Sequence, residues 1–536
     1  MSVAHEIARR RTFAIISHPD AGKTTLTEKL LLYGGAIHVA GQVSARRRQR
    51  QATSDWMALE RERGISITST VLQFPYGGCV VNLLDTPGHQ DFGEDTYRTL
   101  LAADSAVMLI DAAKGIEPRT RKLFEICRER KIPLFTFMNK MDRPSRDPLE
   151  LLDELERELG LHAYPMNWPL GNGDQFRGVY DRRTHQLHLF ERSAHGATRA
   201  PVDVTDPSDA RLQALVDDGE YGRFREALAL LEGAGAAFDV PAMMRGSVSP
   251  VFFGSAVTNF GVGLFLEDFV RMAPPPAPQR TRTGGLVRPD EERFTGFVFK
   301  IQANMDPRHR DRVAFVRICS GRFERDIVVR NERSGEPVRL SRAMRLFADS
   351  RESLEDAYAG DIVGLANPGV FAIGDTLYQG ESIAFPPVPA FAPEHFAAIR
   401  NADAAAYKAF GKGIAQLREE GAVQVFEPWQ PSGYEPIVGV VGELQLEVAR
   451  YRLESEYGVR AVITPQPYAL AMHADASQGV VEKAHLPSNA RLVRDWEGRP
   501  VVLFESEWAL RLACEWNPDV SFLPFTANGV LGNPAS

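Results

Sequence analysis

The feature that most constrains this chain is an eight-residue loop near its start, Ser17-His-Pro-Asp-Ala-Gly-Lys-Thr24. An apolar run at residues 12–16 precedes the loop, and a helical pattern follows it. Such a loop wraps backbone N–H groups around phosphate and aims a helix N-terminus at it. Gly22 permits close approach, Lys23 can reach the β and γ phosphates, and the Thr24 hydroxyl can bind Mg²⁺. The loop therefore predicts an α/β domain that binds a nucleotide.

Serine occupies the first position of this loop, where the common pattern has glycine. Taken alone, the loop indicates a nucleotide site without identifying the nucleotide. An accidental Gly-Lys-Thr at a helix start is the alternative interpretation. The predicted phosphate-binding residues are Ser17, His18, Pro19, Asp20, Ala21, Gly22, Lys23 and Thr24, together with Gly88.

A second motif, Asp85-Thr-Pro-Gly-His89, follows the apolar run at residues 80–84. A carboxylate at the end of a buried strand is placed to hold Mg²⁺, directly or through water. Gly88 can turn sharply and offer its N–H to a γ phosphate. In isolation Asp85 could instead cap the following helix, but its position after the phosphate loop favours a metal site. Thr24 and Asp85 are therefore predicted Mg²⁺ ligands.

A third motif, Asn139-Lys-Met-Asp142, follows the apolar run at residues 134–138. The Asp142 carboxylate can accept both N1–H and N2–H of guanine, a pair of donors that adenine cannot supply. The Lys140 stem can lie over the base, and the backbone N–H groups of Gly254-Ser-Ala256 can complete the pocket. The predicted guanine-binding residues are Asn139, Lys140, Met141, Asp142, Ser255 and Ala256, and the predicted ligands are GTP and GDP.

Short apolar runs alternate with helical stretches from residue 11 to residue 272, which is typical of a parallel sheet wrapped by helices. The predicted core strands are 12–16, 80–84, 106–110, 134–138 and 250–253, with helices at 23–33 and 147–160. The segment between Asp142 and Gly254 is longer than one helix and one strand require. We therefore expect a P-loop GTPase (G) domain over residues 1–273, with an inserted subdomain at about 165–248.

Two proline-rich stretches, residues 272–278 and 384–393, divide the rest of the chain. Consecutive prolines favour extended linkers. Between them the strand-like runs 294–302, 312–320, 326–330 and 361–365 alternate with glycine-rich turns, and no long amphipathic helix is predicted. This pattern indicates a β-barrel domain over residues 279–386.

The last domain is predicted to be α+β, over residues 392–536. Its first part follows the order of a ferredoxin-like unit, with strand 395–399, helix 404–420, strands 423–426 and 436–441, helix 443–457 and strand 459–463. The final seventy or so residues read as a smaller α/β piece with no assigned order, and no internal repeat is evident. A length of 536 residues suggests three or four domains at about 100–200 residues per domain.

The formal net charge of −8 argues against a nucleic-acid binder driven by bulk electrostatics. The net charge does not exclude a large ribonucleoprotein partner that binds local basic patches. A run of basic residues is, however, more often a solvated loop than a binding surface. The two candidate patches are Arg46, Arg47, Arg48 and Arg50, and Arg308, Arg310 and Arg312.

The four cysteines, Cys79, Cys127, Cys319 and Cys514, stand far apart and are expected to be small core residues of a reducing compartment. The first eleven residues lack the apolar core of a secretory signal. No apolar run approaches the length of a membrane span. These features predict a cytoplasmic protein without a membrane anchor.

Together the motifs resemble the translation-factor GTPases, and among these the family of bacterial release factor 3. The resemblance runs from the N-terminus to about residue 465. The similar segments are SHPDAGKTT from Ser17, SDWM from Ser54, RGISIT from Arg63, FPY from Phe74, NLLDTPGH from Asn82, EDTYRTL from Glu94, FTFMNKMD from Phe135, NMDPRHRDRVAFVRICS from Asn304 and SEYG from Ser455. The GELQLE stretch from Gly442 also resembles the third domain of elongation factor G.

The resemblance implies a ribosome-stimulated GTPase that promotes departure of class I release factors from the ribosome after peptide release. It implies that His89 positions the attacking water and that Ser66, or less readily Thr68, completes the Mg²⁺ site. The implied switch and gate residues are Pro19, Ile65, Thr86 and Pro87. The implied partners are the ribosome, through its rRNA and proteins, and the class I factors, and the protein is expected to act as a monomer.

Three alternatives remain open from the sequence. The first is another ribosomal GTPase of the elongation factor G type, although few residues follow the ferredoxin-like unit. The second is a non-catalytic module in which GTP only stabilises a conformation. A GTPase subunit of a metabolic enzyme is a third, more distant possibility.

Overall fold

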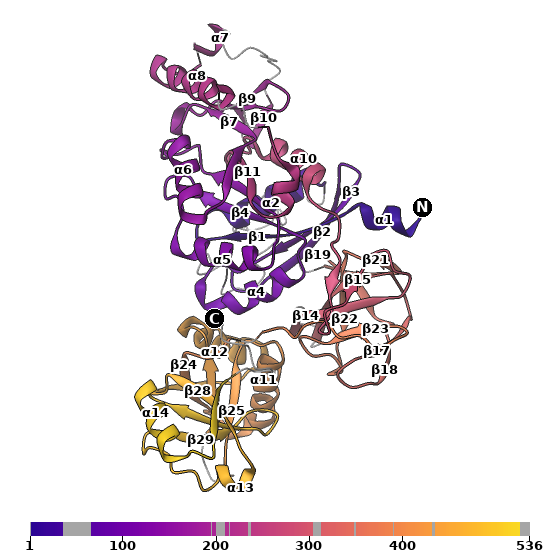
Figure 1. Cartoon of the computed structure of the whole chain (residues 1–536), viewed down its shortest axis with the longest axis vertical. Coiled ribbons are helices and arrows are strands. Elements are labelled where there is room, and N and C mark those ends of the chain that lie inside the picture. The colour runs from indigo at the N-terminus through magenta and orange to yellow at the C-terminus, as the bar shows by residue number, and fades with distance from the viewer. Residues whose placement is uncertain are drawn as a thin grey trace.

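A computed structural model of the chain describes residues 2–35, 60, 66–193, 196–199, 210–213, 215–233, 237–303, 312–347, 350–389, 391–430 and 435–525. Figure 1 shows three bodies: a large α/β body, a β-rich body beside it, and a C-terminal α+β body that lies against the first two. This architecture confirms the predicted fold class.

The first body is built on a seven-stranded sheet with the order β2-β3-β1-β4-β5-β11-β6. All neighbouring strands are parallel except β2 and β3, which form a hairpin. The strands are β1 Arg10–Ser17, β2 Thr70–Tyr76, β3 Cys79–Asp85, β4 Ser105–Asp111, β5 Leu134–Asn139, β6 His162–Pro165 and β11 Val248–Phe253. They contain every predicted core strand.

Helices cover both faces of this sheet, because successive residues of its buried strands point to opposite sides. Ala14 and Ile16 of β1 belong to one apolar core, and Phe13 and Ile15 belong to the other. The first core is closed by α4 Gly93–Leu101, α5 Pro118–Glu129 and α6 Pro148–Leu159, and the second by α2 Lys23–Tyr33 and α10 Val262–Met272. The predicted helix 23–33 is confirmed, as is the helix at 147–160.

Two elements of this body have weak sequence signals. Strand β2 is an antiparallel edge strand that turns into β3 through Gly77 and Gly78, both with positive φ. Strand β6 has only four residues and pairs with β11. Both lie at sheet edges. Only one of the four residues of β6 is buried, whereas β2 is mostly buried but has its apolar run interrupted by Gln73 and Pro75.

The chain between β6 and β11 adds a four-stranded antiparallel sheet in the order β10-β9-β8-β7. Its strands are β7 Asn167–Leu170, β8 Gly178–Asp181, β9 Gln186–Ser193 and β10 Gly196–Arg199. The helices of this segment are η2 Gly173–Gln175, α7 Ala210–Gln213, α8 Asp218–Gly233 and α9 Val240–Met244. Trp168 and Phe253 are in ring contact, which ties this sheet to the central one.

The β-rich body is an antiparallel sheet with the order β18-β17-β23-β14-β15-β22-β19-β20. Its strands are β14 Thr295–Ala303, β15 Arg312–Ser320, β17 Val328–Asn331, β18 Pro337–Arg339, β19 Ala343–Phe347, β20 Ser350–Ser353, β22 Ile362–Ala366 and β23 Thr376–Tyr378. Two small ribbons accompany it, β12 Gln279–Arg280 with β13 Leu286–Val287, and β16 Arg322–Glu324 with β21 Asp356–Tyr358.

The third body contains two ferredoxin-like units in one eight-stranded sheet, β27-β24-β26-β25-β29-β30-β28-β31. The first, predicted, unit comprises β24 His395–Asn401, η3 Ala404–Ala406, α11 Tyr407–Glu419, β25 Gln424–Pro428, β26 Ile437–Val440, α12 Glu443–Tyr457 and β27 Ala461–Gln466. The predicted helix 404–420 is thus a short 3-10 turn followed by an α-helix.

The second unit is made by the C-terminal segment whose order was not assigned from sequence. It comprises β28 Leu470–Asp475, α13 Gln478–Val481, β29 Arg491–Arg494, β30 Pro500–Phe504, α14 Glu507–Trp516 and β31 Ser521–Pro524. The units join edge to edge, because Glu427 and Pro428 of β25 pair with Arg494 and Val493 of β29. The fold therefore contains a topological repeat that the sequence does not reveal.

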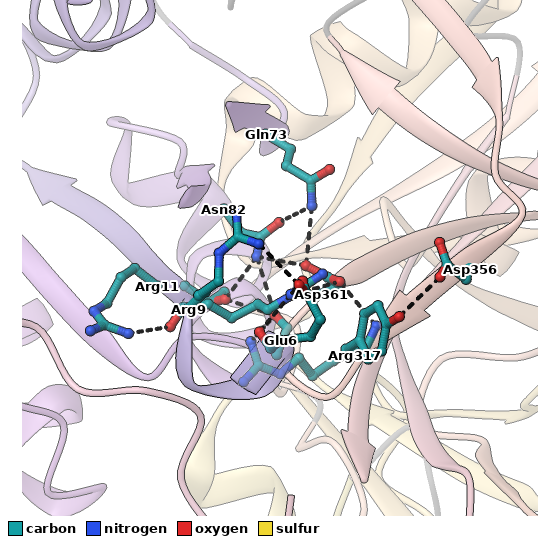
Figure 2. A network of polar contacts seen from close by, with 12 residues as sticks. Glu6, Arg9, Arg11, Gln73, Asn82, Arg317, Asp356 and Asp361 are labelled. Atoms are coloured by element: carbon teal, nitrogen blue, oxygen red, sulfur yellow. Dashed lines mark hydrogen bonds and ion pairs between the residues drawn. The ribbon is translucent and has the colours of Figure 1, made fainter. Parts of the chain in front are cut away.

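Asp361 of the β-rich body is the centre of a buried polar network with the first body (Figure 2). One carboxylate oxygen accepts from Arg10 Nε at 3.1 Å. The other accepts from Gln73 Nε2 at 3.2 Å and Asn82 Nδ2 at 3.3 Å. Arg10 and Asp361 are both buried, so the partners could not be left unpaired without a large cost.

The neighbouring residue, Gly360, lets the two bodies approach closely. Its φ is +103°, and an added Cβ would lie 2.4 Å from Pro276 Cγ. Its carbonyl accepts from Thr12 Oγ1 and from Arg317 Nη1, each at 2.7 Å. Arg317 also pairs with buried Asp104 at 2.5 Å, and this ion pair opposes the rise that burial imposes on the pKa of Asp104.

The first body also touches the β-rich body through the segment after Ser66 and the third body through α4. Lys300 of β14 donates to Ser69 Oγ at 2.8 Å, and burial lowers the pKa of this lysine. Arg98 of α4 donates to the Glu420 carbonyl at 3.3 Å. The Glu420 carboxylate, whose pKa is raised by burial and lowered less by Arg452, pairs with Arg452 at 2.8 Å.

Two sequence expectations need correction or limitation. Cys127 and Cys319 are buried, and burial raises the pKa of each thiol to about 12, but Cys79 is half-buried and Cys514 is exposed. The prediction that all four are core residues is therefore wrong. Of the two basic patches, only Arg312 lies within the described residues, where it pairs with Glu419. No helix in the described part of the chain is long and apolar enough to cross a membrane.

The Asp361 network generates a stability prediction. Asp361→Ala should cost about 1–3 kcal/mol, because the Arg10, Gln73 and Asn82 side chains lose a shared buried acceptor, while Arg10 keeps its ion pair with Glu6. Calorimetry should show the first unfolding transition at a lower temperature than in the wild-type chain. Asp290→Ala, which removes an exposed carboxylate paired with Arg288, is the matched control and should leave the transition in place. Equal effects of the two variants would contradict the role given to Asp361.

Candidate nucleotide-binding site

A cavity of about 280 Å³ lies where β1, β3 and β5 end, at the carboxyl edge of the parallel sheet. This is the edge at which α/β sheets bind ligands. It brings together parts of all three sequence motifs. The lining residues are Ser17, His18, Pro19, Asp20, Gly22, Lys23, Thr24, Thr25, Ser66, Gly88, His89, Asn139, Lys140, Asp142, Arg143 and Val257.

Asn139 holds the phosphate loop against the guanine motif. Its Nδ2 donates to the Ala21 carbonyl at 2.7 Å, and its Oδ1 accepts from Ala256 N at 2.9 Å. Gly22 makes this approach possible, because its φ is +95° and an added Cβ would lie 2.5 Å from Asn139 Nδ2. The asparagine thus connects three loops that are far apart in the sequence.

Lys140 adds a second connection between the same loops. Its Nζ donates to the Asp20 carbonyl at 2.6 Å and to Asp111 Oδ2 at 2.8 Å. Burial alone would raise the pKa of Asp111, but hydrogen bonds from Lys140 and the Ala113 N–H bring it below its usual range. The lysine stem consequently crosses the cavity wall with its ammonium group anchored.

Asp142 provides the most specific feature of the cavity. Its Oδ1 is buried and has no hydrogen-bond partner among the described residues. Buried carboxylate oxygens are costly when they lack a donor, so such an atom marks a position for a ligand donor. Val257, 57% exposed, lies on the same cavity and offers an apolar surface. A flat base with two N–H groups fits this combination.

Four other predicted residues lie behind the cavity wall. The Ala21 and Met141 side chains are fully buried in the cores. Ser255 N donates to the Phe260 carbonyl at 2.9 Å, and Ala256 N donates to Asn139, so these N–H groups are satisfied within the protein. In this structure they shape the wall, and Val257, one residue further on, lines the cavity.

Two of the three predicted metal ligands, Ser66 and Asp85, present oxygen atoms to the Lys23 ammonium group. Lys23 Nζ donates to Ser66 Oγ at 3.0 Å and to Asp85 Oδ1 at 2.5 Å. Hydroxyl and carboxylate oxygens are the donors that Mg²⁺ prefers, and Thr24 lines the same cavity. Because these oxygens already converge on a positive charge, the donor set fits a magnesium ion.

The structure separates Ser66 from Thr68. Thr68 Oγ1 lies 3.2 Å from Glu60 Oε1, which also accepts from the backbone N–H groups of Ile67 and Thr68 at 2.9 and 3.0 Å. Thr68 does not line the cavity, whereas Ser66 does. The geometry therefore favours Ser66 as the metal ligand of this segment.

His89 lies at the rim of the cavity, with about a third of its side chain exposed. Its Nδ1 accepts from Asp91 N at 3.3 Å, and Arg119 donates to its carbonyl at 3.4 Å. Pro19 lines the cavity on the phosphate-loop side, next to Gly88. Thus the imidazole, Gly88 and the phosphate loop border one space.

The remaining gate residues anchor the loop after β3. Buried Thr86 donates through Oγ1 to the Ile15 carbonyl at 2.6 Å, and the Pro87 carbonyl accepts from Thr96 Oγ1 at 3.4 Å. Ile65 lies outside the described residues. Of the two residues of the predicted apolar gate, Pro19 and Ile65, the structure therefore describes only Pro19.

His18 and Ser17 begin the phosphate loop and are both buried. His18 Nε2 lies 2.8 Å from Glu117 Oε2. Burial lowers the pKa of His18, and Glu117 only partly opposes this effect. Neither atom of the pair makes another hydrogen bond among the described residues, and Ser17 Oγ is also without a partner there.

Sequence reasoning missed several residues of the site: Thr25, Asp111, Glu117, Arg143 and Val257. Thr25 and Arg143 directly follow predicted motifs, so adjacency could have identified them. Asp111 directly follows a predicted strand, and the rule that ligands bind at strand carboxyl ends could have identified it. Glu117 and Val257 lie on loops and carry no local signal.

Known protein families match the chain in three consecutive stretches. Residues 8–275 match the family described as Elongation factor Tu GTP binding domain. Residues 293–380 match Elongation factor G domain 2, and residues 385–514 match the C-terminal domain of Class II release factor RF3. The GTPase domain match agrees with the cavity chemistry.

Full-length relatives extend this result. Peptide chain release factor 3 of Gloeobacter violaceus is 58% identical over 522 residues, covering 97% of this chain and 98% of the relative. The protein of the same name from Nostoc punctiforme is 57% identical over 499 residues, covering 93% and 92%. A crystal structure of a Thermus thermophilus protein shares the fold, with a TM-score of 0.68 over 88% of this chain and 71% of that one at 24% identity. The chain belongs to the peptide chain release factor 3 family of translational GTPases.

Proposed function

We propose that this chain is a ribosome-stimulated GTPase of translation termination that promotes departure of class I release factors from the ribosome after peptide release. The observation that carries the nucleotide assignment is the unpartnered Asp142 Oδ1 beside the phosphate loop. Membership of the release factor 3 family supports the termination role. The match of residues 385–514 to a release factor domain disfavours the alternative of an elongation factor G-like translocase.

The proposed guanine site selects its base by hydrogen bonding. The Asp142 carboxylate accepts the two guanine donors, while Lys140 and Val257 contact the faces of the base. Adenine lacks this donor pair and leaves the carboxylate unpaired in a buried position. Asn139, Met141, Ser255 and Ala256 hold the walls of this pocket in place.

The proposed phosphate site comprises Gly88 and the loop Ser17, His18, Pro19, Asp20, Ala21, Gly22, Lys23 and Thr24. Thr24, Ser66 and Asp85 would hold Mg²⁺, in agreement with their oxygen donors. When bound, Mg²⁺ supplies positive charge that stabilises negative charge on phosphate oxygens. Lys23, which contacts both Ser66 and Asp85, keeps a second positive charge within reach of the same position.

Hydrolysis is assigned to a water molecule positioned by His89 at the rim of the cavity. Among the described residues that line it, the only arginine is Arg143, directly after the guanine motif. The chain thus lacks, in its described part, an arginine placed to stabilise the transferred phosphoryl group, and intrinsic hydrolysis is expected to be slow. A surface of the large ribosomal subunit is the proposed activator that brings His89 into place.

The proposed switch reaches the other domains through short paths. Ser69, three residues after Ser66, contacts Lys300 of the barrel, and α4, which follows His89, contacts the third domain at Glu420. A change in the γ-phosphate site can therefore alter the docking of both domains. The proposed domains are 1–273 with an insertion at about 165–248, 279–386 and 392–536. The protein is proposed to act as a cytoplasmic monomer.

Asp142→Asn should exchange the base preference. An amide at this position donates where the carboxylate accepted, so it disfavours guanine and matches the carbonyl of xanthine. GTP affinity should fall by about a hundredfold, from the loss of two charge-assisted hydrogen bonds, while xanthosine triphosphate affinity rises. Equilibrium binding with the two triphosphates checks this. An unchanged preference would refute the guanine site.

Ser66→Ala should raise the Mg²⁺ concentration required for GTP hydrolysis by about tenfold or more, the scale seen for weakened metal sites. Thr68→Ala is the matched control, because its hydroxyl contacts Glu60 instead of the cavity. Both variants are titrated with Mg²⁺ under single-turnover conditions. A larger shift for Thr68→Ala than for Ser66→Ala would reverse the assignment.

His89→Ala should leave GDP and GTP affinity near the wild-type value and lower ribosome-stimulated phosphate release by about 10²–10⁴-fold. His162→Ala, which removes an exposed histidine far from the cavity, serves as the control. Phosphate release is measured with and without vacant ribosomes. A wild-type chain without stimulation would support the non-catalytic module, and full activity of His89→Ala would remove His89 from the mechanism.

A further inference from the structure

We propose that Asp91 is a positioning residue that couples docking of the third domain to the orientation of His89. The proposal rests on the catalytic role proposed for His89. It concerns one carboxylate with two partners, the imidazole of His89 and the N-terminus of α12. The result is a direct path from the third domain to the site of hydrolysis.

On the first side, Asp91 is bound to His89 by two contacts. His89 Nδ1 lies 3.3 Å from Asp91 N and 3.2 Å from Asp91 Oδ1, so it accepts from the N–H when it is unprotonated and donates to the carboxylate when it carries the proton. The Nδ1 edge is therefore held by Asp91, and Nε2 makes no hydrogen bond to any residue that the structure describes. Phe92 limits the ring further through an edge contact at 6.3 Å between centroids.

On the second side, Asp91 caps a helix of another domain. Asp91 Oδ2 accepts from Leu444 N at 2.8 Å, in the first turn of α12. Helix N-termini favour such a carboxylate, because their first N–H groups lack partners within the helix and carry positive partial charge. The N-cap residue of α12 is Gly442, which has no side chain to fill this role. The cap is supplied by the first domain instead.

The contact between Asp91 and α12 requires glycine at position 442, because there is no space for a side chain. An added Cβ would lie 2.1 Å from Asp91 Cγ and 2.5 Å from Asp91 Cβ. Rotation of the aspartate side chain moves Cγ but cannot relieve a clash with Cβ. A side chain at position 442 must therefore separate α12 from the loop that carries His89.

An apolar cluster joins α12 to two segments of the first domain, the one that follows Ser66 and the one that follows His89. It contains Ile67, directly after Ser66, Phe92, three residues after His89, and Val448 of α12, all less than 10% exposed. Leu444 and Tyr451 pack against it. The third domain therefore touches the segments beside the proposed metal ligand and beside the proposed catalytic histidine at once.

These contacts give the coupling a physical basis. When α12 is docked, both carboxylate oxygens of Asp91 have partners and the imidazole has one preferred orientation. When α12 withdraws, Asp91 loses a charge-assisted hydrogen bond and gains rotational freedom, and the imidazole loses its fixed neighbour. Positioning of a catalytic group is a major part of its contribution to rate. Domain docking can therefore control hydrolysis without altering nucleotide binding.

The test changes the third domain alone. Gly442→Ala in the full chain should lower kcat for phosphate release at saturating ribosomes by about tenfold, with GDP affinity unchanged. Gly411→Ala is the matched control, since it lies in the same domain with open space around its added Cβ. Asp91→Ala should lower kcat similarly and speed hydrogen exchange of the Leu444 amide.

The double variant distinguishes this contact from general damage. Removal of the Asp91 side chain makes room at position 442, so Gly442→Ala should cause little further loss in the Asp91→Ala background. Additive losses, or an effect only on the ribosome concentration at half-saturation, would overturn the coupling. The coupling would also be overturned if ribosomes stimulate the wild-type chain and His89→Ala is inactive, but Gly442→Ala has a normal kcat. A wild-type chain without ribosome stimulation would instead overturn the proposed function, and this inference with it.

Discussion

The parallel order of the central sheet is the constraint on which the rest of the structure depends. It brings the carboxyl ends of β1, β3, β4 and β5 to one edge, so that the ends of these strands, Ser17, Asp85, Asp111 and Asn139, meet there. Each of these strands lies next to at least one of the others, and their buried residues alternate between two apolar cores. The chemistry of the site is thus fixed by backbone pairing, and Asn139 and Lys140 then lock the loops together.

Buried polar groups lie at the places where the three domains meet, beside apolar clusters that cross the same boundaries. Four residues with buried side chains make these contacts with the first domain. Asp361 accepts from Arg10, Arg317 pairs with Asp104, Lys300 donates to Ser69, and the Glu420 carbonyl accepts from Arg98. Such groups are costly when unpaired, so a small displacement of one domain breaks specific contacts and does not merely expose surface. Contacts of this kind give discrete docked and undocked states, which is what a nucleotide switch requires.

The predictable and unpredictable parts differ in physical origin. The strands before each motif and the helix after Gly22 were predictable, because burial on both faces imposes continuous apolar runs and the phosphate loop needs a helix start. Edge strand β2 was not predictable, because Gln73 and Pro75 interrupt its apolar run, and neither was the second ferredoxin-like unit, whose strands have only four to six residues. In the site, the motif residues were predictable by adjacency to strands. Val257, Glu117 and the partnership of Asp91 with Leu444 depend on tertiary contacts between distant segments, and no local pattern records them.

A GTP-driven switch that acts on the terminating ribosome is the centre of the proposed mechanism. The most direct measurement is the dissociation rate of a fluorescently labelled class I release factor from ribosomes after peptide release. We predict that this chain with GTP accelerates departure by about tenfold or more, and that Asp142→Asn does so only with xanthosine triphosphate. The same departure rate with and without the chain and its nucleotide would contradict the proposed switch.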